Sequence, residues 1–142
     1  MKKILVIASA LLFCVGLASL AAQKAPAPGA QVERGRYLVE NVAMCGECHS
    51  PRDADGQLDH SRWLEGAPVW FSPTVPQQEW AYRAPVLAGL PSFNDADMTM
   101  VLEKGLQPTG RPIRPPMHVY HMSHEDATAI VAYLRSLPSA KY

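Results

Sequence analysis

The stretch Cys45-Gly46-Glu47-Cys48-His49 decides how the rest of this 142-residue chain is interpreted. The sequence has three cysteines: two stand in this stretch, and Cys14 lies in the apolar N-terminal run. Several uses of two neighbouring thiols compete. A redox dithiol favours a preceding strand, and no strand pattern precedes Cys45. A structural zinc site takes four ligands, usually from two paired clusters, and the sequence has no second cysteine pair.

The histidine directly after the second cysteine favours a third use, the covalent attachment of c-type haem. In a helical turn, positions 45, 48 and 49 are related as i, i+3 and i+4, so their side chains share one face. The two thiols can then form thioethers to the two vinyl groups of a porphyrin, and the histidine lies beneath the iron. We predict one haem c, attached through Cys45 and Cys48 and ligated on one side by His49.

A second iron ligand is expected on the opposite side, because the iron of a haem electron carrier is usually ligated on both sides. Met117 follows Pro115-Pro116, and prolines lower the entropy that a loop loses when it presents one side chain. Met122 is the next candidate, and His118 or His121 would give bis-histidine ligation. We predict Met117, which would raise the reduction potential relative to a second histidine.

The N-terminal segment has the parts of a secretory signal peptide in their usual order. Lys2 and Lys3 precede an apolar run, and small residues follow it, with cleavage expected after Ala21 or Ala22. An uncleaved anchor is the alternative, because the 19 residues from Ile4 to Ala22 are just long enough to span a bilayer. We expect a periplasmic product, with membrane contact only if this segment is retained as an anchor.

Composition and proline placement set the domain organisation. All 13 prolines follow residue 22, and ten lie between Pro51 and Pro116, which argues against long helices or central strands there. The chain has 13 basic and 13 acidic side chains and no basic run, so nucleic acid is not an expected partner. We divide the chain into a signal peptide at 1–22, a flexible tether at 23–31, a folded domain at 32–138 and a C-terminal tail at 139–142.

Three helices are predicted in the folded domain. The first runs from Val32 to Ala43 with a stripe of Gly35, Leu38, Val42 and Cys45. Gly35 inside this helix predicts a close contact with another segment, for which the large residues Tyr133 and Leu134 are the candidates.

The other two helices carry end signals. Asn94 and Gly105 bound a helix over Asp95–Lys104, and Ser123 begins the last helix, which Pro138 ends. No segment alternates with period two. The sequence therefore predicts an all-α domain with long Pro-bearing loops.

These residues resemble the class I c-type cytochrome domain over about Val32 to Leu137. The resemblance rests on the stretch Arg34–Leu38 before the two cysteines, on Lys104-Gly105, Gly110-Arg111 and Pro116-Met117, and on a last helix like those of dehydrogenase-associated bacterial cytochromes. It implies a cytochrome c-like fold of three or more helices around one covalently bound haem, with the terminal helices crossing near Gly35. It also implies axial ligation by His49 and Met117.

The chain departs from that family pattern between the motif and the second helix. The turn that usually follows the motif, whose carbonyl orients the histidine, is found only later and imperfectly as Gly66-Ala67-Pro68-Val69, so Pro68 is the candidate for that role. The segment from Arg52 to Arg83 is long and holds Trp63, Trp70 and Trp80. One or two of these tryptophans are expected to line the haem; a partner-facing patch is the alternative.

The resemblance implies an electron carrier, not an enzyme, that moves single electrons between redox protein partners and serves alone or as a subunit of a dehydrogenase or oxidase system. A haem sensor or peroxidase-like protein with a displaceable distal ligand is the alternative, and no distal His–Arg pair supports it. A metal or dithiol protein without haem is the third hypothesis.

Overall fold

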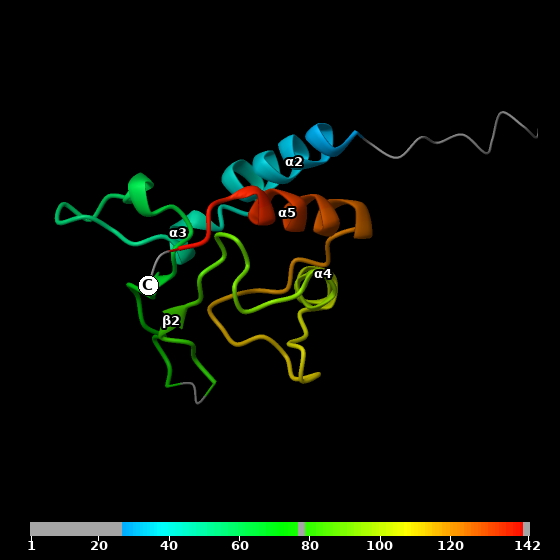
Figure 1. The fold of residues 1–142 in the computed structure, drawn as a ribbon. Coiled ribbons are helices and arrows are strands. Elements are labelled where there is room, and N and C mark those ends of the chain that lie inside the picture. The colour runs from blue at the N-terminus through cyan, green and yellow to red at the C-terminus, as the bar shows by residue number, and fades with distance from the viewer. Residues whose placement is uncertain (1–26, 77–78, 141–142) are drawn as a thin grey trace, which may run out of the picture.

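The computed structural model describes residues 27–76 and 79–140, so the signal-peptide prediction and residues 23–26 of the tether prediction lie outside the described residues. The elements in chain order are α2 (Pro28–Tyr37), the π-helical turn η1 (Leu38–Val42), α3 (Gly46–His49), the 3-10 turn η2 (His60–Arg62), β1 (Ala67–Pro68), β2 (Arg83–Ala84), α4 (Asp95–Lys104) and α5 (His124–Ser136). Figure 1 shows α2 lying along α5, with α4 and the long loops on the other side of α5. No helix in the described part of the chain is long and apolar enough to cross a membrane.

Helices make up nearly all of the regular secondary structure among the described residues, and the predicted all-α class is confirmed. Their one sheet pairs the two-residue strands β1 and β2 in antiparallel register, with Ala67 opposite Ala84 and Pro68 opposite Arg83. This short pairing closes the loop that contains residues 69–82.

The first helix differs from its prediction at both ends. It begins at Pro28, where a missing N–H costs nothing, so residues 28–31 are helical and do not belong to the expected tether. Its continuation η1 has π-helical hydrogen bonds, with the N–H of Ala43 donating to the carbonyl of Leu38 at 2.8 Å. The wider turn rotates the buried face: Val39 is 0% exposed and Val42 is 52% exposed, whereas the predicted stripe contained Val42.

The two terminal helices cross at Gly35, as predicted. A Cβ on Gly35 would overlap the backbone carbonyl of Ala129 and would lie 2.8 Å from the Cβ of Tyr133. Around the crossing, the Tyr133 hydroxyl donates to the Glu40 carboxylate at 2.8 Å. The helix backbones therefore approach as closely as a glycine allows.

The other two helices begin and end as their sequence predicts. The side chain of Asn94 accepts from the N–H of Asp97 at 2.8 Å, and Gly105 ends α4 with a left-handed φ of 66°. The Ser123 hydroxyl accepts from the N–H of Asp126 at 3.1 Å and caps α5. Each cap satisfies a backbone group that the helix end would leave unpaired.

The core is formed by helices and irregular segments together. Its fully or nearly buried members are Leu38, Val39, Leu64, Leu87, Ala88, Leu90, Met98, Leu102, Ala127, Ile130, Val131, Tyr133 and Leu134. Arg135 on α5 holds the irregular part by donating to the carbonyls of Gly89 at 2.9 Å and Phe93 at 2.6 Å. The backbone of residues 89–93 is thus fixed against α5 without regular secondary structure.

Gly35→Ala should lower the free energy of unfolding by about 1–3 kcal/mol, because the added methyl group must push the α2 and α5 backbones apart. Gly29→Ala is the matched control on the same helix: nothing lies within 4 Å of its Cβ position, so the helix propensity of alanine should stabilise the protein by up to about 1 kcal/mol. Denaturant unfolding of both variants checks this. Equal changes in the free energy of unfolding for the two variants would contradict a close contact of α2 and α5 at Gly35.

Candidate functional site

The residues of the cysteine motif lie on one helical turn. Cys45 is the residue before α3, and its carbonyl accepts from the N–H of His49 at 3.0 Å. The side chains of Cys45 and Cys48 are partly buried and not joined by a disulfide, and His49 is buried. The structure thus brings the three predicted motif residues onto the same short helix.

The imidazole of His49 is held by a backbone carbonyl. Its Nδ1 lies 2.8 Å from the carbonyl oxygen of Pro85; because a carbonyl only accepts, Nδ1 carries the proton and Nε2 keeps its lone pair. Burial lowers the pKa of His49 and outweighs the opposing effect of this hydrogen bond. The ring is therefore neutral at neutral pH, which is the form that binds a metal.

The expectation for Pro68 is wrong. Pro68 is exposed and pairs with Arg83 in the small sheet, whereas the carbonyl that orients His49 comes from Pro85. The reason is topological: β2 returns antiparallel to β1 and carries the chain back to the motif helix. The distance along the sequence does not reveal this return.

The thiols of the motif are not activated. Burial raises the pKa of Cys45 to about 11, and burial together with the charge of Glu47 raises the pKa of Cys48. A redox dithiol works through a thiolate with a lowered pKa. The electrostatics of this site therefore argue against the dithiol hypothesis.

A tryptophan supports the motif helix from the side. The ring of Trp63 lies where a Cβ on Gly46 would be, and the ring of His60 stacks on Trp63 with centroids 5.7 Å apart. Trp70 instead is 65% exposed, and the Cζ atom of the Arg52 guanidinium lies 5.1 Å from the centroid of its ring. Of the three tryptophans, Trp63 thus backs the motif and Trp70 belongs to the surface.

The loop that carries Met117 is tied down before it reaches that residue. The carbonyl of Pro115 accepts from the N–H of Ala81 at 2.7 Å, and the N–H of Ile113 donates to the carbonyl of Gly105 at 2.8 Å. Met117 itself is half-buried. The loop therefore has a defined course between α4 and the methionine.

The other three candidates for the second ligand have different surroundings. Met122 packs against the core, and its N–H donates to the carbonyl of Leu102 at 3.2 Å. His118 is exposed and packs on the ring of Tyr120, with centroids 4.2 Å apart. His121 is exposed.

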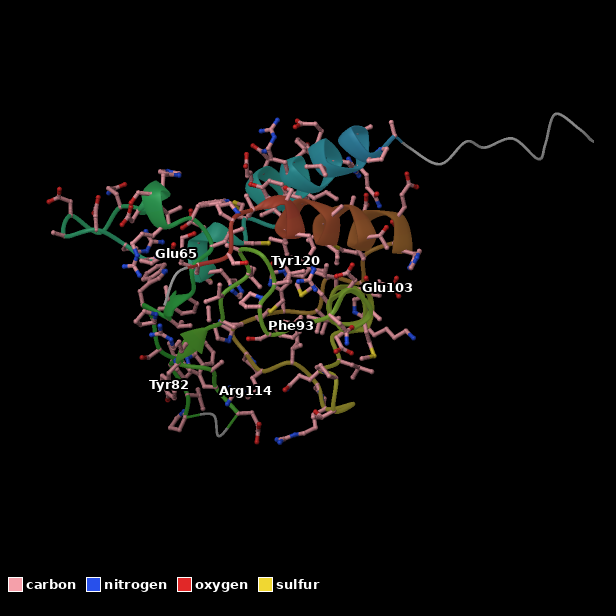
Figure 2. All side chains as sticks on the ribbon, viewed as in Figure 1. Glu65, Tyr82, Phe93, Glu103, Arg114 and Tyr120 are labelled. Carbon is pink, nitrogen blue, oxygen red and sulfur yellow. The ribbon has the colours of Figure 1, made fainter. Side chains whose placement is uncertain are left out.

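Tyr120 is a site residue that the sequence analysis missed. Its hydroxyl donates to the carbonyl of Ala43 at 3.1 Å, which joins the loop after Met117 to the segment just before the motif. Figure 2 shows it in the middle of the molecule, below α5 in this view. Burial raises its pKa to about 12, and the two motif thiols add to the effect. No pattern around residue 120 marks it, because its partner lies 77 residues away.

Buried donors without an acceptor show whether a haem suits this site. Among the described residues, three buried donors have no hydrogen-bond partner: Nε of Arg52 and the indole Nε1 atoms of Trp63 and Trp80. Buried polar groups rarely lack a partner, and the carboxylates of a haem are acceptors of the kind that such donors need. Two thiols and a neutral imidazole on one helical turn, together with these unpartnered donors, therefore fit a covalently attached haem.

Comparison with known proteins shows the family of this chain. A match to the cytochrome c family covers residues 32–138. The chain belongs to the cytochrome c family. Haem c and electron transport, expected from the motif, are confirmed at the level of the family, as is the expectation of an electron carrier that is not an enzyme.

Three relatives share about a third of their aligned residues with this cytochrome. The fructose dehydrogenase cytochrome subunit of Gluconobacter japonicus is 34% identical over 75% of this chain and 22% of its own length. A diheme cytochrome c-type protein of Cereibacter sphaeroides is 34% identical over 75% of this chain and 36% of its own length. The gluconate 2-dehydrogenase cytochrome c subunit of Pantoea cypripedii is 32% identical over 80% of this chain and 29% of its own length. The chain spans between about a fifth and a third of the length of these relatives.

Tyr120→Phe should reduce the alkaline loss of stability. The pKa of Tyr120 is about 12 in the folded protein and ordinarily 10. Its contribution to the free energy of unfolding is therefore complete below pH 10 and is lost as the pH rises toward 12. The variant should also lose about 1 kcal/mol at neutral pH with the hydrogen bond to Ala43. Denaturant unfolding across this pH range measures both effects. The same pH dependence in variant and wild type would argue against a buried, bonded hydroxyl.

Proposed function

We propose that this chain is an exported monohaem c-type cytochrome that carries single electrons between redox protein partners, with His49 and Met117 as iron ligands. The observation that carries the proposal is the neutral, buried imidazole of His49, held by Pro85 on the same helical turn as two unactivated thiols. When bound, the haem supplies a metal centre that gains and loses one electron.

The chain's own residues bind and shield that group. Cys45 and Cys48 would hold it through thioethers, and the lone pair on Nε2 of His49 would ligate the metal. The Trp80 indole offers a donor to a haem carboxylate. Because the 142 residues contain one such motif, we propose one haem in this chain, although one relative is named as a diheme protein.

Met117 is proposed as the second ligand because each of the alternative side chains is either packed in the core or exposed to solvent. Met122 packs in the core, and His118 and His121 are exposed. The loop before Met117 is bonded at Pro115 and Ile113, which lowers the entropy lost when the sulfur is presented. A thioether ligand would set the potential above that of a bis-histidine centre.

The partner and the compartment are proposed from the relatives and the N-terminal segment. Two of the relatives are named as cytochrome subunits of sugar or sugar-acid dehydrogenases, so we propose that a dehydrogenase complex supplies the electrons. Residues 1–22 would direct the chain to the periplasm and be removed there. Intact mass of the periplasmic product tests the export and the cleavage together.

The defining experiment expresses the full chain in a host that attaches c-type haem. We expect one haem per chain by pyridine haemochrome, a mass equal to polypeptide plus haem, and a low-spin spectrum. Cys45→Ser with Cys48→Ser should give bare polypeptide. A haem-free wild type beside a fully loaded control cytochrome would contradict the proposal, whereas high-spin iron that binds carbon monoxide at once would indicate the sensor or peroxidase-like function.

Met117→Leu should keep the haem attached, lower the reduction potential and allow external ligands to bind, because leucine preserves the volume and removes the sulfur. Met122→Leu is the matched control and should change neither property. Redox titration and a titration with imidazole measure the two effects. A drop in potential for Met122→Leu alone would reassign the ligand.

A further inference from the structure

The residue that follows His49 is fully buried and bonded to a distant loop. Ser50 is 1% exposed, and its Oγ accepts a 2.9 Å hydrogen bond from the backbone N–H of Leu64. Leu64 is itself 0% exposed and has a left-handed φ of 59°. A leucine keeps this conformation only where its surroundings hold it. The Ser50 hydroxyl is one of the groups that do so.

Leu64 in turn holds the segment that contains Pro85. Its carbonyl accepts from the N–H groups of residues 87 and 88, at 2.9 and 3.1 Å. Pro85, two residues earlier, provides the carbonyl that accepts from Nδ1 of His49 at 2.8 Å. A closed path of bonds therefore runs from Ser50 through Leu64 to Pro85 and back to His49.

We propose that Ser50 is a positioning residue for the His49 imidazole: its hydroxyl holds Leu64 and thereby places the Pro85 carbonyl at Nδ1. The inference rests on the proposed function, because it takes His49 as the iron ligand. A strong hydrogen bond from Nδ1 makes the ring a better electron donor, which favours the oxidised metal. Ser50, which touches neither iron nor porphyrin in this scheme, thus tunes the reduction potential through the backbone.

The second bond between these segments is made by backbone alone. The N–H of Gly66 donates to the carbonyl of His49 at 2.7 Å, and this bond involves no side chain at position 50. The hydroxyl is therefore the part of the arrangement that a substitution can remove while the chain keeps its course. A Ser50 variant separates positioning from folding.

The test compares Ser50→Ala with Ser50→Thr in the haem-loaded protein. Ser50→Ala leaves the N–H of Leu64 without its acceptor, so we expect a higher reduction potential and faster solvent exchange of the His49 Nδ1 proton, followed by NMR of the reduced protein. Ser50→Thr keeps a hydroxyl and should return both toward the wild-type values. Gly29→Ala is the control: nothing lies within 4 Å of its Cβ position on α2, so both properties should stay unchanged.

The outcomes separate this inference from the proposed function. A loaded, six-coordinate Ser50→Ala protein with wild-type potential and exchange rate would overturn the inference alone. A haem-free wild type would overturn both. If Ser50→Ala yields no loaded protein, exchange in the wild type decides: the Leu64 amide and the His49 Nδ1 proton should become exposed in the same opening event, and separate openings would overturn the inference.

Discussion

The close crossing of α2 and α5 at Gly35 is the contact on which the rest of this cytochrome depends. It brings η1, which leads into Cys45, against the helix that carries Tyr133 and Arg135. From there, Tyr133 bonds to Glu40 before the motif, and Arg135 fixes the irregular segment after Pro85. A glycine without a side chain thus sets the distance between the two parts of the chain that meet at the site.

The site itself is built mostly from irregular backbone. The motif helix has only four residues, and its histidine, the Pro85 carbonyl and the Met117 loop are held by hydrogen bonds between loops. We expect such a construction to change little when a bound haem gains or loses an electron, because hydrogen bonds link its loops to one another. That rigidity suits a protein whose proposed task is to gain and lose an electron without rearrangement.

Local chemistry made part of this structure predictable. The caps at Asn94, Gly105 and Ser123 and the helical turn of the cysteine motif depend on neighbours within a few residues, and the structure has them where the sequence predicts them. The start of α2 was missed because Ala27 offers no capping side chain, and the π turn was missed because the periodic pattern of the sequence does not encode the extra residue. Pro85 and Tyr120 act on partners 36 and 77 residues away, and a single sequence gives no sign of such pairings.

The two spacer positions between the cysteines are not interchangeable. Gly46 lies under the Trp63 ring, whereas Glu47 is exposed and forms a 2.8 Å ion pair with Arg52 that contributes little energy at the surface. When this pentapeptide is varied, or transferred to another protein as a haem-attachment tag, position 47 can therefore be changed freely. Position 46 can be changed only together with position 63. A larger residue at 46 calls for a smaller ring at 63, so these two positions should co-vary when sequences of this type are aligned.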